Sequence, residues 1–75
     1  MTVDNLTRIL KAKGYKMAEY TLWSNNTYTD YVKDWKLAMS TKRVKGTGET
    51  EVVAIYSNFE EELKEMGIEV GTILK

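Results

Sequence analysis

The sequence KGTGETEVVAIY, residues 45–56, decides how this chain folds. Its first five residues place two glycines between two strand-like runs, a pattern typical of a β-hairpin turn. Residues 50–56 then form the most apolar part of the chain, with apolar side chains at both odd and even positions. We therefore expect a central strand that is covered on both faces.

The run before this turn fits two structures. Thr29 could cap a helix with one apolar side, formed by Tyr31, Trp35, Ala38 and Met39. The same residues also belong to an alternating pattern, in which Trp35, Leu37 and Met39 are separated by more polar positions. We favour a strand from about Val32 to Val44, because aromatic and β-branched residues are frequent and a hairpin turn follows.

The N-terminal segment has the pattern of an amphipathic helix. Thr2 or Asp4 can cap it, and the apolar residues Val3, Leu6, Ile9 and Leu10 share one side. Gly14 should end it, with Tyr15 folding back on Leu10. Alternation then predicts a strand from Lys16 to Trp23 and a turn over residues 24–27.

A second helix is expected after the central strand. Ser57 or Asn58 can begin it, with Glu60 or Glu61 completing a capping box. Its apolar side consists of Phe59, Leu63 and Met66. Gly67 should end this helix, and Ile68–Leu74 is a candidate edge strand.

Together these elements predict a single α+β domain over residues 1–75. We expect a small antiparallel sheet of three strands, with the C-terminal tail as a candidate fourth. An N-terminal and a C-terminal helix should pack on it.

Composition argues against enzymatic chemistry. The chain has no cysteine and no histidine, so it lacks thiol nucleophiles, disulfides and the commonest catalytic base and metal ligand. The densest carboxylate group, Glu60, Glu61, Glu62 and Glu65, is explained by the start of a surface helix. We therefore expect no enzyme activity, no metal and no cofactor. Short apolar runs and the absence of a signal-peptide pattern lead us to expect a cytoplasmic protein that does not enter membranes.

The formal net charge is zero, but the charges are unevenly spread along the chain. Residues 1–47 carry an excess of five basic side chains, and residues 48–75 carry an excess of five acidic ones. The two halves either neutralise each other in the fold or form separate faces.

Two kinds of binding surface can be built from these residues. The first is a protein interface anchored by aromatic residues, together with acidic residues of the second helix: Trp23, Tyr28, Tyr31, Trp35, Glu60 and Glu61. The second is a nucleic-acid surface at the hairpin that uses Lys42, Arg43 and Lys45 beside exposed aromatics. The sequence pI near 6.2 favours the protein interface, because nucleic-acid-binding domains usually carry a net basic charge.

The N-terminal segment also resembles a known family. Leu6, Arg8, Leu10, Lys11, Lys13, Tyr15 and Met17 follow the order and spacing of the opening helix and strand of a small phage-encoded anti-CRISPR protein that inhibits the type II effector nuclease. The resemblance implies an inhibitor that acts by binding a protein. That family is strongly acidic and mimics DNA, whereas this chain is neutral, so DNA mimicry is not implied.

These observations predict a non-enzymatic accessory or regulatory protein, encoded by a phage or mobile element, that binds and inhibits a protein partner as a monomer or homodimer. Nucleic-acid binding is the alternative.

Overall fold

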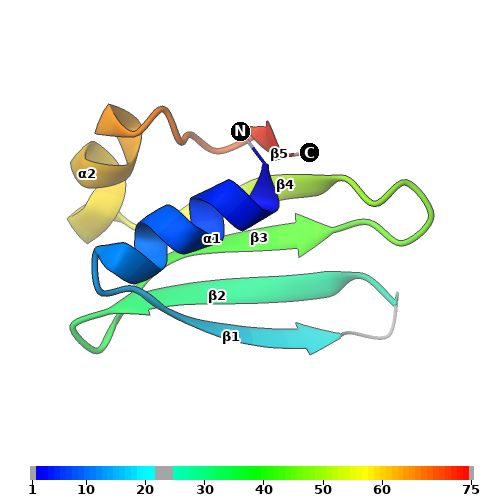
Figure 1. The fold of residues 1–75 in the computed structure, drawn as a ribbon, viewed down its shortest axis with the longest axis horizontal. Coiled ribbons are helices and arrows are strands. Elements are labelled where there is room, and N and C mark those ends of the chain that lie inside the picture. Colours follow the sequence, from blue (N-terminus) through cyan, green and yellow to red (C-terminus); the bar gives the residue numbers. More distant parts are fainter. Residues whose placement is uncertain (1, 22–24, 75) are drawn as a thin grey trace.

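The computed structural model describes residues 2–21 and 25–74. The elements are α1 (Val3–Ala12), β1 (Lys16–Thr21), β2 (Thr27–Lys33), β3 (Lys36–Arg43), β4 (Thr50–Ile55), the 3₁₀ helix η1 (Ser57–Phe59), α2 (Glu60–Glu65) and β5 (Ile73–Leu74). All five strands pair antiparallel in the order β1-β2-β3-β4-β5 (Figure 1). The protein is therefore α+β, as the sequence predicts.

Helix α1 begins and ends where the sequence predicts. The Asn5 backbone N–H donates to Thr2 Oγ1 at 3.1 Å, which satisfies an amide that the first turn leaves free. At the other end Gly14 has a φ of 94°, and the Tyr15 N–H donates to the Leu10 carbonyl at 3.0 Å. This left-handed glycine turns the chain directly into β1.

The expectation of one strand from Val32 to Val44 is wrong, because a tight turn divides it. Asp34 and Trp35 have φ values of 54° and 65°, both in the left-handed region that a type I′ hairpin turn requires. Such turns favour Asn-Gly or Asp-Gly, so Asp34 fits the first position, but Trp35 stands where glycine is expected and hides the turn pattern. The sheet consequently has five strands rather than the expected three or four. The choice of strand over helix for this region is confirmed.

The predicted hairpin turn after β3 is confirmed. The Val44 N–H donates to the Glu49 carbonyl at 2.9 Å, and the Gly48 N–H donates to the Val44 carbonyl at 3.0 Å. Gly46 and Gly48 both have positive φ values, which explains the two glycines in this turn. Leu22, Trp23 and Ser24, in the predicted β1 end and following turn, lie outside the described residues.

Two β-bulges shift the pairing register of the sheet. Tyr31 pairs with Met39 and Val32 with Leu37, so Ala38 is an extra residue in β3. Thr41 pairs with Val52 and Ser40 with Ala54, so Val53 is an extra residue in β4. An extra residue shifts the alternation of the strand, and therefore changes which side chains point to each face.

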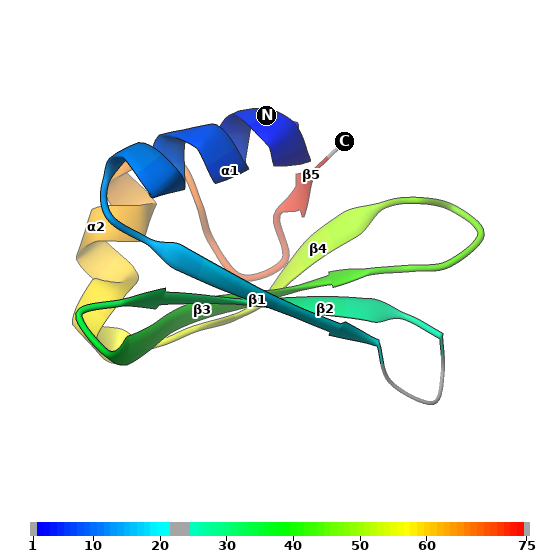
Figure 2. The same ribbon diagram turned by 60° about the horizontal axis from the view of Figure 1, so that its bottom comes forward.

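Both helices lie on the same side of the sheet. Helix α1 crosses one face, and α2 packs beside it at the end where the β2–β3 turn lies (Figure 2). Between them and the sheet lies the core, which consists of Leu6, Leu10, Tyr15, Tyr31, Ala38, Met39, Val52, Phe59, Leu63, Ile68 and Leu74. The opposite face of β1 to β4 has no described element over it. The expectation that β4 is covered on both faces is therefore wrong.

The C-terminal segment confirms the expected apolar side of α2, but only Ile73–Leu74 of the expected Ile68–Leu74 edge strand pairs with β4. Phe59 and Leu63 are buried, and Met66 packs against the core. After Gly67, the Ile68 N–H donates to the Leu63 carbonyl at 3.0 Å. The expected capping box does not form, because η1 precedes α2 and no side chain in the described part of the chain caps either element.

A polar contact joins the β2 end of the first tight turn to α2. Lys33 Nζ donates to Glu62 Oε1 at 3.1 Å and lies 5.0 Å from the centroid of the Tyr15 ring. The hydrogen bond from Lys33 lowers the pKa of Glu62. Desolvation and the neighbouring Glu62 carboxylate raise the pKa of Tyr15 to about 12. Lys33 therefore favours the charged form of Glu62, whereas burial and the Glu62 carboxylate favour the neutral form of Tyr15.

We predict that Glu62→Gln lowers the free energy of unfolding at pH 7 by about 0.5 kcal/mol, as expected for a partly exposed ion pair. Because the pKa of Glu62 is lowered in the folded state, this stabilisation is present above its unfolded pKa and is lost as the pH falls through its folded pKa. Urea unfolding should show the difference shrinking below about pH 4.

The neighbouring exposed Glu61 provides the control, because it forms no salt bridge among residues 2–21 and 25–74. Glu61→Gln removes an equivalent charge from the first turn of α2 without breaking an ion pair, so it should lower stability at pH 7 less than Glu62→Gln does. A wild-type advantage over Glu62→Gln that stays constant from pH 7 to pH 3 would contradict the assignment.

Candidate functional site

The uncovered face of the sheet carries a cluster of tyrosines. Strand alternation and register place Tyr20, Tyr28, Lys42 and Glu51 in one row across β1 to β4. The next row contains Ala18, Asp30, Ser40 and Ala54, and the one beyond it contains Lys16, Val32 and Leu37. We call this surface the open face.

Aromatic side chains on the open face pack on one another while remaining accessible. The rings of Tyr20 and Tyr28 stack with centroids 5.7 Å apart and an interplanar angle of 13°. Tyr20 is 42% exposed, and Tyr56, which follows β4, is 41% exposed. In a domain this small, large aromatic side chains left half exposed are candidates for contact with a partner.

A carboxylate lies within this tyrosine cluster. Ser40 Oγ donates to Asp30 Oδ1 at 2.7 Å, and Ser40 itself is buried. Desolvation, followed by the charge of Asp30 and the neighbouring Tyr28 and Tyr56, raises the pKa of Tyr20. Tyr20 therefore stays protonated at neutral pH and can donate a hydrogen bond from the open face.

Trp35 is the most exposed large apolar side chain described. It lies at the tip of the β2–β3 turn, where it is 97% exposed and has a φ of 65°. A residue with a Cβ atom in this conformation costs about 1–2 kcal/mol, a penalty that glycine avoids. Neither burial nor turn geometry explains a tryptophan here. Strain combined with exposure makes Trp35 a candidate contact residue.

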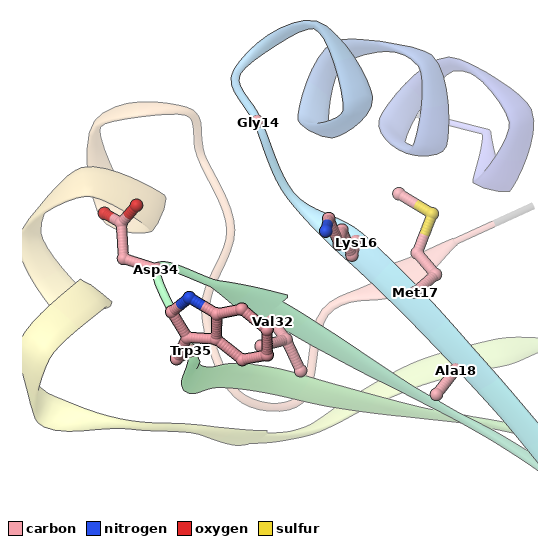
Figure 3. Close-up of a pocket in the computed structure, with 7 residues that line it drawn as sticks. All are labelled: Gly14, Lys16, Met17, Ala18, Val32, Asp34 and Trp35. Carbon is pink, nitrogen blue, oxygen red and sulfur yellow. The ribbon is translucent and has the colours of Figure 1, made fainter.

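A shallow pocket of about 320 Å³ lies beside Trp35 at the start of β1, lined by Gly14, Lys16, Met17, Ala18, Val32, Asp34 and Trp35 (Figure 3). Lys16 Nζ is 5.9 Å from the Trp35 ring centroid. The Asp34 carboxylate points away from the Trp35 ring, and Met17 points toward α1 (Figure 3). The ammonium of Lys16 is therefore the charge that faces the apolar wall formed by Ala18, Val32 and Trp35.

The structure separates the predicted aromatic residues. Tyr28 lies on the open face and Trp35 at its end. Tyr31 is 2% exposed and belongs to the core, so its placement in an exposed interface is wrong: its strand position points toward α1. Trp23 lies outside the described residues. Glu60 and Glu61 are exposed on α2 and do not belong to the open face.

Sequence reasoning did not assign Tyr20, Tyr56 and Leu37 to the site. The period-two pattern shows that Tyr20 shares a face with Ala18, but it does not show which face is covered. For Tyr56, unbroken alternation along β4 predicts the same face as the buried Val52. The bulge at Val53 moves Ala54, and by continued alternation Tyr56, to the open face.

The three basic residues of the alternative surface do not form one patch. Lys42 lies on the open face beside Tyr28, whereas alternation directs Arg43 to the other face. Arg43 and Lys45 instead line a separate shallow depression with Thr21, Asn25 and Thr27. Only Lys42 therefore accompanies the stacked tyrosines.

Within residues 2–21 and 25–74, no cluster of three or more acidic side chains is arranged to hold a metal ion. No helix in the described part of the chain is long and apolar enough to cross a membrane.

Comparison with known proteins found no matching family model, no matching curated protein and no matching solved structure.

We predict that Trp35→Gly makes the protein more stable. Glycine relieves the backbone strain at a positive φ. The substitution removes few contacts, because the indole is almost fully exposed. The free energy of unfolding should therefore rise by about 0.5–1 kcal/mol. Urea unfolding followed by circular dichroism measures this change.

Lys36→Gly is the matched control. Lys36 is the next residue, is also exposed, and begins a regular strand, so glycine there should lower stability. A Trp35→Gly protein that is less stable than wild type would show that Trp35 supports the fold.

Proposed function

We propose that this chain is a non-enzymatic regulatory protein that binds and inhibits a protein partner through the open face of its sheet. The observation that carries this proposal is the row of accessible tyrosines on a sheet face that no described element covers, with the strained, exposed Trp35 at its end.

The composition of the open face favours a protein as the partner. Tyrosine and tryptophan supply large contact areas with few rotatable bonds, and they are enriched where protein interfaces are strongest. The charges on this face are balanced, with Lys16 and Lys42 against Asp30 and Glu51. A mixed polar and aromatic surface of this kind complements another protein better than it complements a uniformly anionic polymer.

Two carboxylates form hydrogen bonds with other side chains of the fold, which is a structural role. Asp30 accepts from Ser40, and Glu62 accepts from Lys33. With no histidine or cysteine in the sequence, a role in binding is better supported than a role in catalysis. A small domain of this kind regulates by occupying a surface that its partner needs.

The resemblance of the N-terminal segment to anti-CRISPR inhibitors supports inhibition as the outcome of binding. The resembling residues span α1 and the start of β1, ending at Met17. This segment leads into the strand that carries Tyr20, so it adjoins the proposed surface. We propose a phage or mobile element as the source on the same basis.

Single-stranded nucleic acid is the second candidate ligand. Tyr28 lies opposite Lys42 in register and stacks with Tyr20, so bases could stack on the rings while a phosphate meets the lysine. Asp30 and Glu51 on the same face oppose this interpretation, because they repel a phosphate backbone.

We predict that the immobilised protein retains a protein partner from host lysate after nuclease treatment and in high salt. The double variant Tyr20→Ala, Tyr28→Ala should weaken binding to that partner at least about tenfold, as expected for aromatic residues central to an interface. Titration with the purified partner measures the change, and circular dichroism checks that the variant is folded.

Lys64→Ala, an exposed substitution on α2, is the control and should bind like wild type. Equal binding by the double variant and wild type would contradict the proposal. Loss of all partners after nuclease or salt treatment would favour the second candidate, for which affinity for an oligothymidylate should fall steeply as salt rises.

A further inference from the structure

Strand β1 forms a free edge of the sheet. It pairs with β2 through six consecutive residue pairs from Lys16 to Thr21, and no described strand lies on its other side. In an antiparallel pair, alternate residues direct their N–H and C=O groups away from the partner strand. β1 is the outermost strand of the sheet (Figure 1), so its unpaired backbone donors and acceptors lie along the border of the open face.

This edge has few of the features that protect sheet edges. The pairing of β1 with β2 has no bulge, and β1 contains no proline or glycine. Most of its side chains are exposed. Its two charges are Lys16 at one end and Glu19 near the middle. The opposite edge differs, because β5 has two residues and the chain reaches it through a hydrogen-bonded turn.

The pocket beside Trp35 lies at the end of this same edge. Lys16 belongs both to β1 and to the pocket, where its ammonium faces the indole of Trp35 at 5.9 Å. Ala18 and Val32 complete the apolar wall (Figure 3). An occupant of matching charge would bring a carboxylate to Lys16 and an apolar group to Trp35.

We propose that β1 binds an extended segment of a partner protein as an added sixth strand, with an acidic side chain at Lys16 and an apolar side chain against Trp35. This inference rests on the proposed function as a protein-binding domain, and it names the kind of segment that is bound. A peptide backbone is the occupant because its alternating amides and carbonyls match those of a free strand edge.

A second copy of this chain fits the edge less well. When two β1 strands pair antiparallel in one continuous sheet, opposite residues lie on the same face. The one acidic residue of β1, Glu19, lies on the α1 face, whereas Lys16 lies on the open face. Pairing between copies would therefore leave Lys16 without a carboxylate. A different protein supplies the better charge match.

The test uses peptides as probes. A random twelve-residue peptide library displayed on phage is selected against the full-length protein, and enriched peptides are synthesised. We expect alternating sequences that contain Asp or Glu. In NMR spectra of ¹⁵N-labelled protein, peptide binding should slow hydrogen exchange at alternate amides of residues 16–21. Binding should also shift the tryptophan emission to shorter wavelength, and this shift should be absent in a Trp35→Phe protein.

Two matched sets of variants test the pairing. N-methylation of the peptide amides that face β1 should weaken binding at least tenfold, whereas methylation of the alternate amides should not. The Lys16→Glu variant should bind the acidic peptide at least tenfold more weakly than wild type does. The same variant should bind more tightly to a peptide in which lysine replaces the acidic residue than to the acidic peptide. Lys64→Glu, on α2, should bind like wild type.

Strand addition is overturned if no peptide is enriched, if enriched peptides protect a different surface, or if both methylated sets bind equally. It is also overturned if sedimentation shows that the free protein is a dimer whose β1 amides are already protected. If the protein captures a partner through Tyr20 and Tyr28 but shows none of these peptide effects, strand addition is wrong and the proposed function is still supported.

Discussion

The packing of α1 against one face of the sheet is the interaction on which the rest of this structure depends. Leu6 and Leu10 are fully buried against strand residues that include Met39 and Val52. A chain of 75 residues has few helical turns to bury, and both of its helices lie on this side. Residues 2–21 and 25–74 therefore form one core and leave one face of the sheet bare. Strand residues that point away from the helices remain available for contacts outside the chain.

The tight turn between β2 and β3 connects folding with binding. It lets the chain form two strands where one long strand was expected, and it places a tryptophan at the tip in a conformation that suits glycine. Next to the same turn, the Lys33–Glu62 hydrogen bond joins β2 to α2. The end of the sheet that carries the exposed indole is thus held in position by a polar contact as well as by the core. Lys16 faces the indole from β1, so this end also carries a positive charge that a bound segment would meet.

Local patterns in the sequence determined the class of the fold and most element boundaries. The Gly14 and Gly67 helix ends, the Thr2 cap, the Gly46–Gly48 hairpin and the apolar side of α2 all depend on neighbouring residues, so they were predictable. The absence of histidine and cysteine likewise restricts the chemistry that any fold of this chain could perform. Tyr28 and Trp35 were recognised as candidate contacts from their residue type alone.

The tertiary structure alone decided which face of the sheet is bare. Period-two alternation divides strand residues into two sets, but the helices choose which set is buried, which is why Tyr31 lies in the core and Tyr20 is half exposed. Bulges at Ala38 and Val53 then changed the alternation where no glycine or proline indicated them. The Asp34–Trp35 turn also lacked a complete local pattern, since Trp35 stands where a type I′ turn favours glycine. These features depend on contacts between distant segments, and such contacts exist only in the folded chain.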